Sequence, residues 1–230
     1  MILDYVLTVV AAGWVTLQVA LVALFFAIAL GLLGAVCKMS THPFLMQAAE
    51  AYTSVIRGIP DLVMMLLIFY GAPAVVNYLI ELAGGDGSFD LNPFLAGTLT
   101  LGIIFGAYLT ETFRGAILGI PKGQAEAGLA FGMSNTRVYL RIILPQMVRL
   151  AIPGFTNNWL VLVKCTALVS IIGLEDIMFK ARGASEATRQ PFTFYLVTAL
   201  VYLAITTVSM LMLRWLEKKY SMGFKPANFS

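Results

Sequence analysis

Charge is what this sequence has least of. Only 12% of its 230 residues are Asp, Glu, Lys or Arg, whereas 60% are hydrophobic. A soluble domain carries about 25% charged residues. No charged residue occurs between Asp4 and Lys38, and roughly 20 apolar residues are enough to cross a bilayer. The composition therefore excludes an ordinary soluble domain and indicates an integral membrane protein.

Side chains for metal binding and catalysis are also scarce. The two cysteines, Cys37 and Cys165, lie in or beside apolar segments and match no disulfide or metal-binding spacing. His42 is the single histidine, so neither a histidine-based metal site nor a proton relay is expected. The N-terminus has no basic segment ahead of its apolar stretch, so no cleavable signal peptide is expected. We therefore predict no catalytic residue and no metal ligand.

The apolar runs predict an all-α integral membrane protein that forms a single transmembrane domain over residues 1–230. Polar or glycine-rich segments separate the runs, for example AGGDGSFDLN at residues 83–92. Lys164 interrupts the fourth run. The five predicted spans are residues 14–37, 57–82, 91–115, 147–174 and 192–214.

Basic residues predict the orientation of these spans, because they accumulate on the cytoplasmic side. Five spans place the two termini on opposite sides. Eleven basic residues fall on one side: Lys38, Arg57, Arg114, Lys122, Arg137, Arg141, Arg149, Arg214, Lys218, Lys219 and Lys225. Three fall on the other: Lys180, Arg182 and Arg189. We therefore expect a periplasmic N-terminus, a cytoplasmic C-terminus and a cytoplasmic loop at residues 119–145.

That loop, GIPKGQAEAGLAFGMSNTRVYLRIILP, is the longest polar interruption and has helical spacing in its apolar residues. We predict a short helix from Gln124 to Phe131, a hinge at Gly132 and a second short helix. Ser134 is expected to cap the second helix through its hydroxyl, and Pro145 to end it. The pattern suits docking to another protein, although its spacing alone fits a solvated loop equally well.

The run Arg57-Gly58-Ile59-Pro60-Asp61 stands at the head of the second span. Pro60 removes a backbone donor, so a break is expected here, and broken helices at membrane depth line cavities. A carboxylate at this depth costs a few kcal/mol unless it is paired or hydrated. Asp61 is therefore either an interfacial carboxylate paired with Arg57 or a cavity group that attracts a cationic substrate.

Glu111 and Arg114 lie three residues apart near the end of the third span, so they share one helix face. A structural ion pair is the favoured interpretation, and a substrate-facing Glu111 is the alternative. Tyr108 lies one turn earlier on the same face. It would share that site.

Polar residues also interrupt the fourth span. Lys164 indicates an interface or a polar cavity, and Asn157 and Asn158 favour helix–helix contact. Thr166 and Ser170 follow. Their hydroxyls are candidate donors to a substrate carboxylate, with helix packing as an equal alternative.

One family combines these features. Glu126, Ala127, Gly132, Ile142, Leu144 and Pro145 resemble the EAA loop of ABC-importer permeases, the coupling helix that docks on the ATPase subunit. The segments RGIPDLVMMLLIFYG, GAYLTETFRGAI, NNWLVLVKCTALVSIIGLEDI and QPFTFYLVTALVYLAITTVS resemble the polar amino-acid branch, nearest to the histidine, lysine, arginine, ornithine and opine permeases. The likeness covers residues 13–223. One departure is Gly128, where the commoner loop has Ala, which predicts a softer docking helix.

The resemblance implies that Gln124, Glu126, Ala127, Gly132 and Pro145 couple the chain to an ATPase dimer. It also implies a second, non-identical permease chain and a periplasmic binding protein. The branch usually has an uncharged residue after its R-G-x-P motif, so Asp61 is similar to the subgroup for basic substrates.

We therefore expect the transmembrane subunit of an ATP-driven importer of a basic amino acid or opine in the bacterial inner membrane. The chain has no G-x-x-x-x-G-K-[ST] loop, so ATP–Mg is expected on the partner ATPase and no cofactor on this chain. A permease for glutamine, glutamate or a similar substrate is the alternative. A stand-alone channel and a membrane enzyme fit less well, because scattered carboxylates and one histidine form no catalytic set.

Overall fold

The computed structural model describes residues 2–85 and 87–221, and all regular structure within them is helical, as predicted. The order of elements is α1 Ile2–Ala11, α2 Gly13–Lys38, α3 Pro43–Gly58, α4 Asp61–Leu66, η1 Leu67–Gly71, α5 Ala72–Leu82, α6 Pro93–Leu118, α7 Lys122–Ala130, α8 Asn135–Val138, η2 Tyr139–Ile143, α9 Leu144–Cys165, η3 Thr166–Ile172, α10 Ile177–Thr188 and α11 Pro191–Ser221. Here η1 and η2 are π-helical turns and η3 is a 3₁₀ helix.

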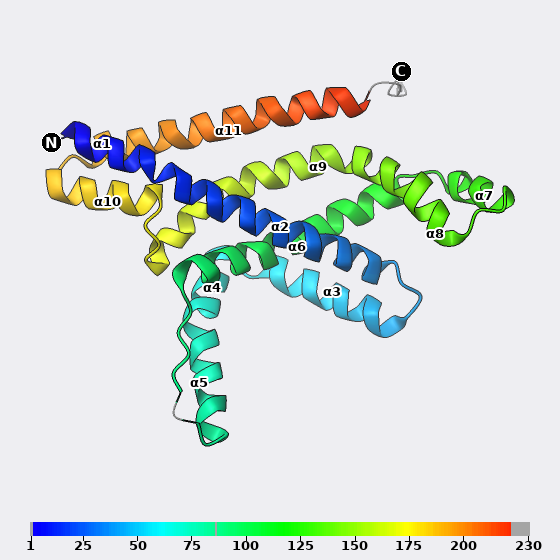
Figure 1. Ribbon diagram of the computed structural model, residues 1–230, viewed down its shortest axis with the longest axis horizontal. Coiled ribbons are helices and arrows are strands. Elements are labelled where there is room, and N and C mark those ends of the chain that lie inside the picture. The colour runs from blue at the N-terminus through cyan, green and yellow to red at the C-terminus, as the bar shows by residue number, and fades with distance from the viewer. Residues whose placement is uncertain (1, 86, 222–230) are drawn as a thin grey trace.

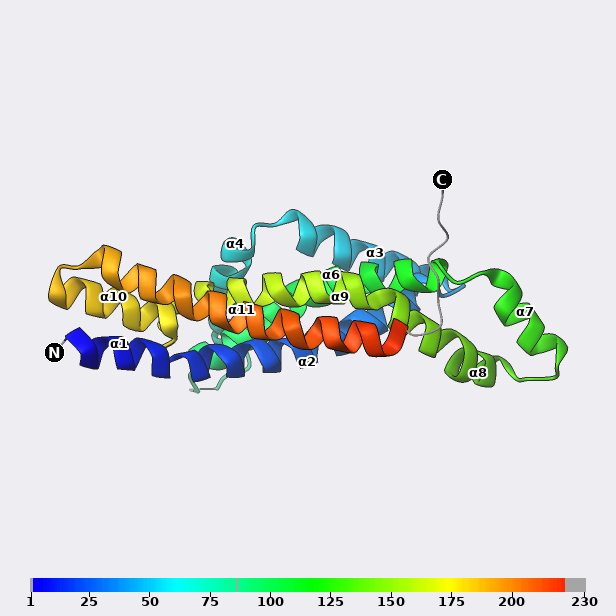
Figure 2. The same cartoon turned by 90° about the horizontal axis from the view of Figure 1, so that it is seen from above.

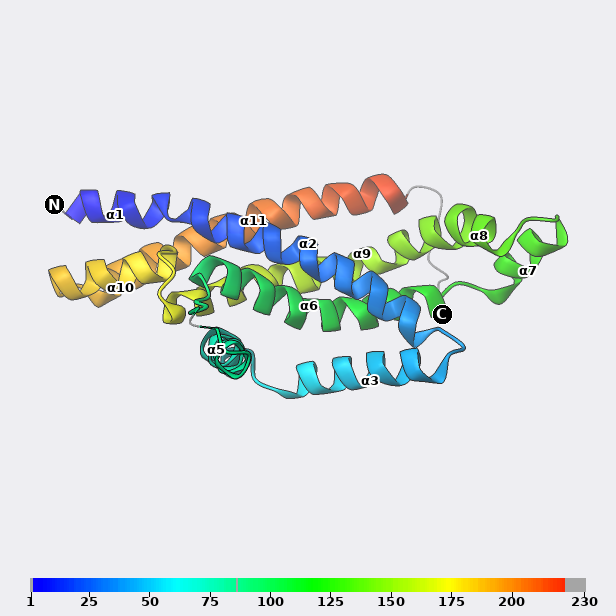
Figure 3. The same ribbon diagram turned by 60° about the horizontal axis from the view of Figure 1, so that its bottom comes forward.

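Five segments of the described chain are long and apolar enough to cross a membrane, as predicted. They are Ile2–Lys38, Asp61–Leu82, Pro93–Leu118, Asn135–Ile172 and Pro191–Lys219. Four of them run along the long axis of the molecule, as α2, α6, α9 and α11 show in Figure 1. The segment that contains α5 leaves this bundle and crosses its axis, so that Figure 3 views α5 end-on.

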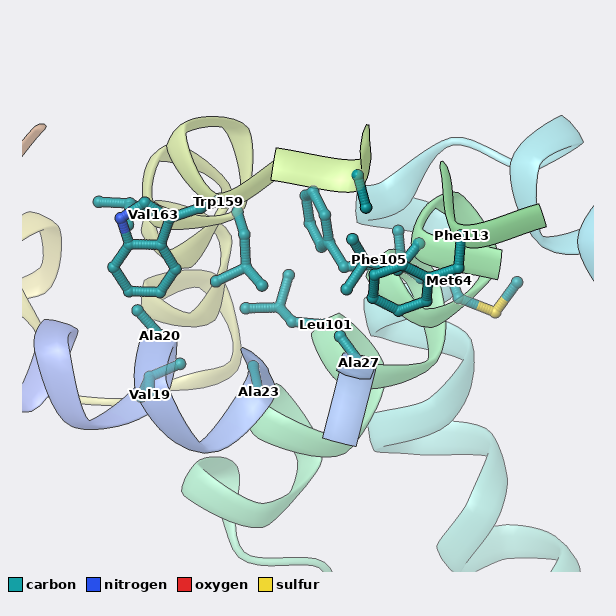
Figure 4. Close-up of a cluster of buried hydrophobic side chains, with 14 of the residues drawn as sticks. Val19, Ala20, Ala23, Ala27, Met64, Leu101, Phe105, Phe113, Trp159 and Val163 are labelled. Atoms are coloured by element: carbon teal, nitrogen blue, oxygen red, sulfur yellow. The ribbon is translucent and has the colours of Figure 1, made fainter. Parts of the chain in front are cut away.

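Close contact between α2 and α6 forms the centre of the bundle. Small residues permit this approach, since a Cβ on Gly102 would lie 2.7 Å from Cβ of Phe26 and one on Gly106 would lie 2.8 Å from Cβ of Leu30. Such contacts are typical of membrane helix pairs, where backbones approach across glycine and alanine. The buried core around them includes Val19, Ala23, Leu101, Phe105 and Trp159 (Figure 4).

The two ends of the bundle are built from different elements. A small apolar cluster of Val9, Ile177, Ala181 and Phe194 joins α1, α10 and α11 at one end. The opposite end carries α7, α8 and the last turns of α11 (Figure 2). Helices α7 and α8 and the last turns of α11, which hold Lys122, Arg137 and Arg214, therefore lie toward one end, and α10, which holds Arg182, lies at the other. Lys225, which also entered the prediction of orientation, lies outside the described residues.

The glycine-rich segment after α5 folds back along that helix. Asn77 of α5 donates through Nδ2 to the carbonyl of Phe89 at 3.0 Å and accepts from its backbone N–H at 2.6 Å. Gly84 adopts a φ of +77° at the turn, which favours glycine. Asp86, within this predicted loop, lies outside the described residues.

The expectation that Pro145 ends a helix was wrong, because α8, η2 and α9 form one continuous run. Proline lacks an N–H and its ring clashes with the carbonyl four residues earlier. Here the π-helical turn shifts the backbone hydrogen bonds by one residue, since Leu144 N–H donates to the carbonyl of Tyr139, five residues back. Pro145 directly follows this turn, and the shifted pairing accommodates a residue that has no N–H to donate.

Candidate functional site

The predicted break before Asp61 is present. Helix α3 ends at Gly58, Ile59 and Pro60 are extended, and α4 begins at Asp61. The half-buried Asp61 carboxylate thus lies at a helix N-terminus, where the backbone dipoles favour negative charge. The break also brings it to the end of α9, where the Sγ of Cys165 donates to Oδ2 at 3.7 Å.

Arg57 does not pair with Asp61. Among the ion pairs and hydrogen bonds of the described residues, none involves its side chain. Its guanidinium carbon instead lies 5.3 Å from the centre of the Tyr108 ring, a cation–π contact. Tyr108 therefore faces the last turn of α3, and its place beside Glu111 in a substrate site stays a prediction. Asp61 therefore has no basic partner among the described ion pairs.

Glu111 belongs to an ion-pair network, and its predicted pair with Arg114 is confirmed at 3.0 Å. Lys38 also contacts Glu111 and lies 2.8 Å from Glu50. The Lys38 side chain is only 5% exposed. The network therefore joins the end of α2 to α3 and α6. Lys38 and Glu50 were missed because their meeting depends on how three helices pack, which no local spacing encodes.

Tyr52 holds α3 against α6 beside this network. Its hydroxyl donates to the carbonyl of Ile103 at 2.6 Å, and burial raises the pKa of Tyr52 to about 12. A Cβ on Gly106 would lie 2.8 Å from the Tyr52 hydroxyl, so this bond depends on a glycine. No pattern in the sequence indicated this contact.

Thr166 and Ser170 use their hydroxyls within their own helical turns. Thr166 donates to the carbonyl of Val163 at 2.6 Å and is fully buried, and Ser170 donates to that of Ala167 at 2.8 Å. These bonds are local, and the Thr166 hydroxyl also lies 3.4 Å from the Tyr202 hydroxyl of α11. Their role as substrate ligands stays a prediction.

Asn158 makes the helix–helix contact that was expected of the two asparagines. Its Nδ2 donates to the Thr112 hydroxyl of α6 and to the Gly154 carbonyl, both at 3.0 Å. Asn157 is exposed. A half-buried amide thus joins α9 to α6.

The loop at residues 119–145 projects from one end of the bundle (Figure 1). Helix α7 begins two residues before the predicted Gln124 and is followed by the predicted hinge, where Gly132 has a φ of +77°. Ser134 occupies the N-cap position of α8, but its side chain makes no capping hydrogen bond. At the tip, Phe131 is 90% exposed.

Gly128 is a packing residue. It is buried in α7, and a Cβ there would lie 2.7 Å from Cδ1 of Ile142 and 3.0 Å from Cγ2 of Val138. The departure from the commoner alanine therefore lets α7 lie close to α8 and η2. The expectation of a softer helix considered only the cost of glycine to the helix and left this contact out.

Comparison with known proteins places this architecture among transporter subunits. A crystal structure described as an amino acid ABC transporter with histidines matches with a TM-score of 0.80 and 28% identity over 94% of this chain and 96% of that chain. An inward-facing MetNI methionine ABC transporter matches with a TM-score of 0.72 at 17% identity, which shows the fold alone. The fold is that of an ABC-transporter permease.

Sequence relatives specify the family. The sequence profile of the binding-protein-dependent transport system inner membrane component matches residues 27–222, so the chain belongs to this family. The histidine/lysine/arginine/ornithine transport system permease protein HisQ of Escherichia coli K12 is 48% identical over 214 residues, 93% of each chain. The octopine transport system permease protein OccQ of Rhizobium radiobacter is 40% identical over 91% of this chain and 89% of its own.

Proposed function

We propose that this chain is the transmembrane subunit of an ATP-driven importer for a basic amino acid or an opine. The relatives named for histidine, lysine, arginine, ornithine and octopine transport support the substrate class. The observation that carries the proposal is Asp61, a half-buried carboxylate that has no basic partner among the described ion pairs. A charge in such surroundings is stabilised by a cation.

Asp61 would bind the cationic end of the substrate. A guanidinium donates two parallel hydrogen bonds to a carboxylate, and charge-assisted bonds of this kind are about twice as strong as neutral ones. Tyr108 remains a candidate for the same site, although its ring already contacts the guanidinium of Arg57. Glu111, Thr166 and Ser170 remain weaker candidates for this site, because each side chain already has a partner within the chain.

Energy would enter through the projecting loop. Helix α7 presents Gln124, Glu126 and Ala127 to solvent next to the exposed Phe131, a surface suited to a groove on an ATPase. ATP–Mg would bind the ATPase dimer and not this chain. A second, non-identical permease chain and a periplasmic binding protein would complete the importer, with the loop in the cytoplasm and the N-terminus in the periplasm.

The substrate class is tested by ATPase stimulation of the reconstituted importer. The complex with its binding protein would be compared across arginine, lysine, histidine, ornithine and neutral glutamine. We expect stimulation by the basic amino acids and little by glutamine. Equal stimulation by glutamine would support the alternative of a permease for polar neutral amino acids and would remove Asp61 from cation recognition.

Asp61→Asn tests the residue itself. The variant keeps the size of the side chain and loses its charge, so we expect the transport rate for arginine to fall about tenfold or more while the ATPase still copurifies. Asp90→Asn is a matched control, since Asp90 is exposed in the segment before α6. Normal arginine uptake by Asp61→Asn would contradict the proposed role.

A further inference from the structure

A charged pocket lies where α2, α3 and α6 meet. Its volume is about 330 Å³, and its charged lining consists of Lys38, Glu50, Arg57, Glu111 and Arg114. It is lined mainly by polar groups, unlike the apolar grooves against α11. A hollow of this size holds a small polar molecule.

Four of the five charged side chains satisfy one another. Lys38 contacts Glu50 and Glu111, and Arg114 contacts Glu111. Arg57 alone among the five has no carboxylate within ion-pair distance in the described chain. With three cations and two carboxylates in its lining, the pocket has an excess positive charge that resides on Arg57.

The position of Arg57 suits an anionic ligand. The Tyr108 ring holds the guanidinium in place, and this contact uses no carboxylate partner. A guanidinium is always protonated and presents five N–H donors in a fork that fits a carboxylate. Arg57 is exposed in the last turn of α3, just before the candidate membrane span that begins at Asp61, so its guanidinium donors are accessible to a bound carboxylate.

We infer that Arg57 binds the α-carboxylate of the transported amino acid and that the charged pocket holds this end of the substrate. The inference rests on the proposed function and deepens it. Asp61, four residues further along the chain, would bind the cationic end. Glu50 and Glu111 lie in the same pocket, where their carboxylates are acceptors for the ammonium group that a zwitterionic amino acid carries beside its carboxylate.

The test uses the assembled permease–ATPase complex in nanodiscs without binding protein, whose own selectivity would mask that of the permease. Equilibrium binding of labelled arginine is measured in competition with agmatine, which lacks the carboxylate, and with citrulline, which lacks the side-chain charge. The wild type should prefer arginine over agmatine by about tenfold or more, the effect of one charge-assisted carboxylate contact. The agmatine ratio tests Arg57 and the citrulline ratio tests the proposed substrate class, so the two can fail separately.

Arg57→Gln should reduce the preference for arginine over agmatine to about threefold or less and leave the preference over citrulline in place. Arg57→Lys keeps the charge without the fork and should give an intermediate ratio, which also serves if the glutamine variant does not assemble. Arg182→Gln, an exposed arginine on α10, is the matched control. An unchanged ratio of arginine to agmatine binding in Arg57→Gln would overturn the inference. Equally tighter binding of arginine and agmatine in this variant would also overturn it, because Arg57 would then only repel the cationic end of each ligand.

Discussion

At the scale of single residues, Asp176 has the most unusual environment outside the predicted spans. It caps α10, where Oδ1 accepts from the backbone N–H of Phe179 at 2.9 Å. The residue is fully buried, and Oδ2 has no hydrogen-bond partner in the described chain. Burial disfavours the charged form and raises the pKa of Asp176 from 3.8 to about 6. The carboxyl is therefore retained at some cost to stability at neutral pH.

This shift predicts a pH dependence of stability. Between pH 4 and 6 the folded state binds more protons at Asp176 than the unfolded state does, so its contribution to stability falls as pH rises through that window. Asp176→Asn keeps the capping oxygen and removes the charge. Above pH 6 the variant should therefore be more stable than the wild type by up to about 3 kcal/mol. Thermal unfolding of the purified complex from pH 4 to 7.5 measures this difference.

The difference between variant and wild type is the decisive quantity, because other groups titrate in the same range. It should grow from pH 4 to 6 and then level off. A difference independent of pH, or a variant less stable than the wild type at pH 7, would show that Asp176 has a compensating partner.

Single residues also show where sequence reasoning reached the candidate site and where it stopped. The Glu111–Arg114 pair was predictable because both residues lie on one helix, three positions apart. The alternative pairing of Asp61 with Arg57 assumed that neighbours in sequence meet, but the break at Pro60 turns α4 away from α3. Lys38 and Cys165 reach this region from α2 and α9, so only the packed structure could identify them.

At the scale of elements, the contact between α2 and α6 is the strictest requirement of the fold. On Gly102 a methyl group would meet the Cβ of Phe26, an atom fixed to the backbone of α2. The two helices could relieve the overlap only by moving apart.

Gly102→Ala should therefore destabilise the protein by about 1–3 kcal/mol, the usual effect of overpacking. Gly115→Ala is the matched control on the same helix, because nothing lies within 4 Å of a Cβ there and alanine favours the helix. The melting temperature should fall in the first variant and stay level or rise in the second. Equal stability of Gly102→Ala and the wild type would mean that α2 and α6 adjust freely.

The hinge after α7 sets the shape of the projecting loop. Gly132 has a φ of +77°, and Met133 N–H donates to the carbonyl of Gly128 across the turn, as in a Schellman motif. Proline fixes φ near −65°, so Gly132→Pro must rebuild this turn and move α7 relative to α8.

We expect Gly132→Pro to lose copurification of the ATPase or the stimulation of its activity by substrate, and Glu126→Lys to do the same by reversing a charge on α7. Ser134→Pro is the control in the same loop, because Ser134 already has a φ of −67°. A complex of Gly132→Pro that assembles and is stimulated like the wild type would refute the coupling role.

At the scale of the whole molecule, the fold class and the number of apolar helices were readable from the sequence, since length and hydropathy decide both. The direction of α5 was not. Apart from Asn77 and Glu81 this helix is mostly apolar, and none of its residues is buried, so its composition does not distinguish a helix inside the bundle from one that crosses its axis. The uninterrupted passage through Pro145 was hidden for a similar reason, because a π-helical turn leaves no composition signal.

The predicted orientation can be tested on the whole chain. In a variant with Cys37 and Cys165 replaced by alanine, Ser134→Cys should react with an impermeant maleimide in inside-out vesicles and stay unlabelled in intact cells with a permeabilised outer membrane. Glu186→Cys, exposed on α10 at the opposite end, should show the reverse. Labelling of Ser134→Cys from outside the cell would contradict the predicted orientation.

The continuity from Asn135 to Ile172 has a mechanical meaning. At about 1.5 Å per residue this helical segment is roughly 55 Å long. One end lies at the projecting loop, and Cys165, the donor to Asp61, lies near the other end. A helix without an intervening loop transmits rotation about its axis as well as displacement along it. A partner that rotated the helix at the α7 end would therefore also rotate Cys165 beside Asp61. The π-helical turn η2 and Pro153 interrupt the regular backbone hydrogen bonds of this helix, so their stiffness would determine how much of the rotation reaches Cys165.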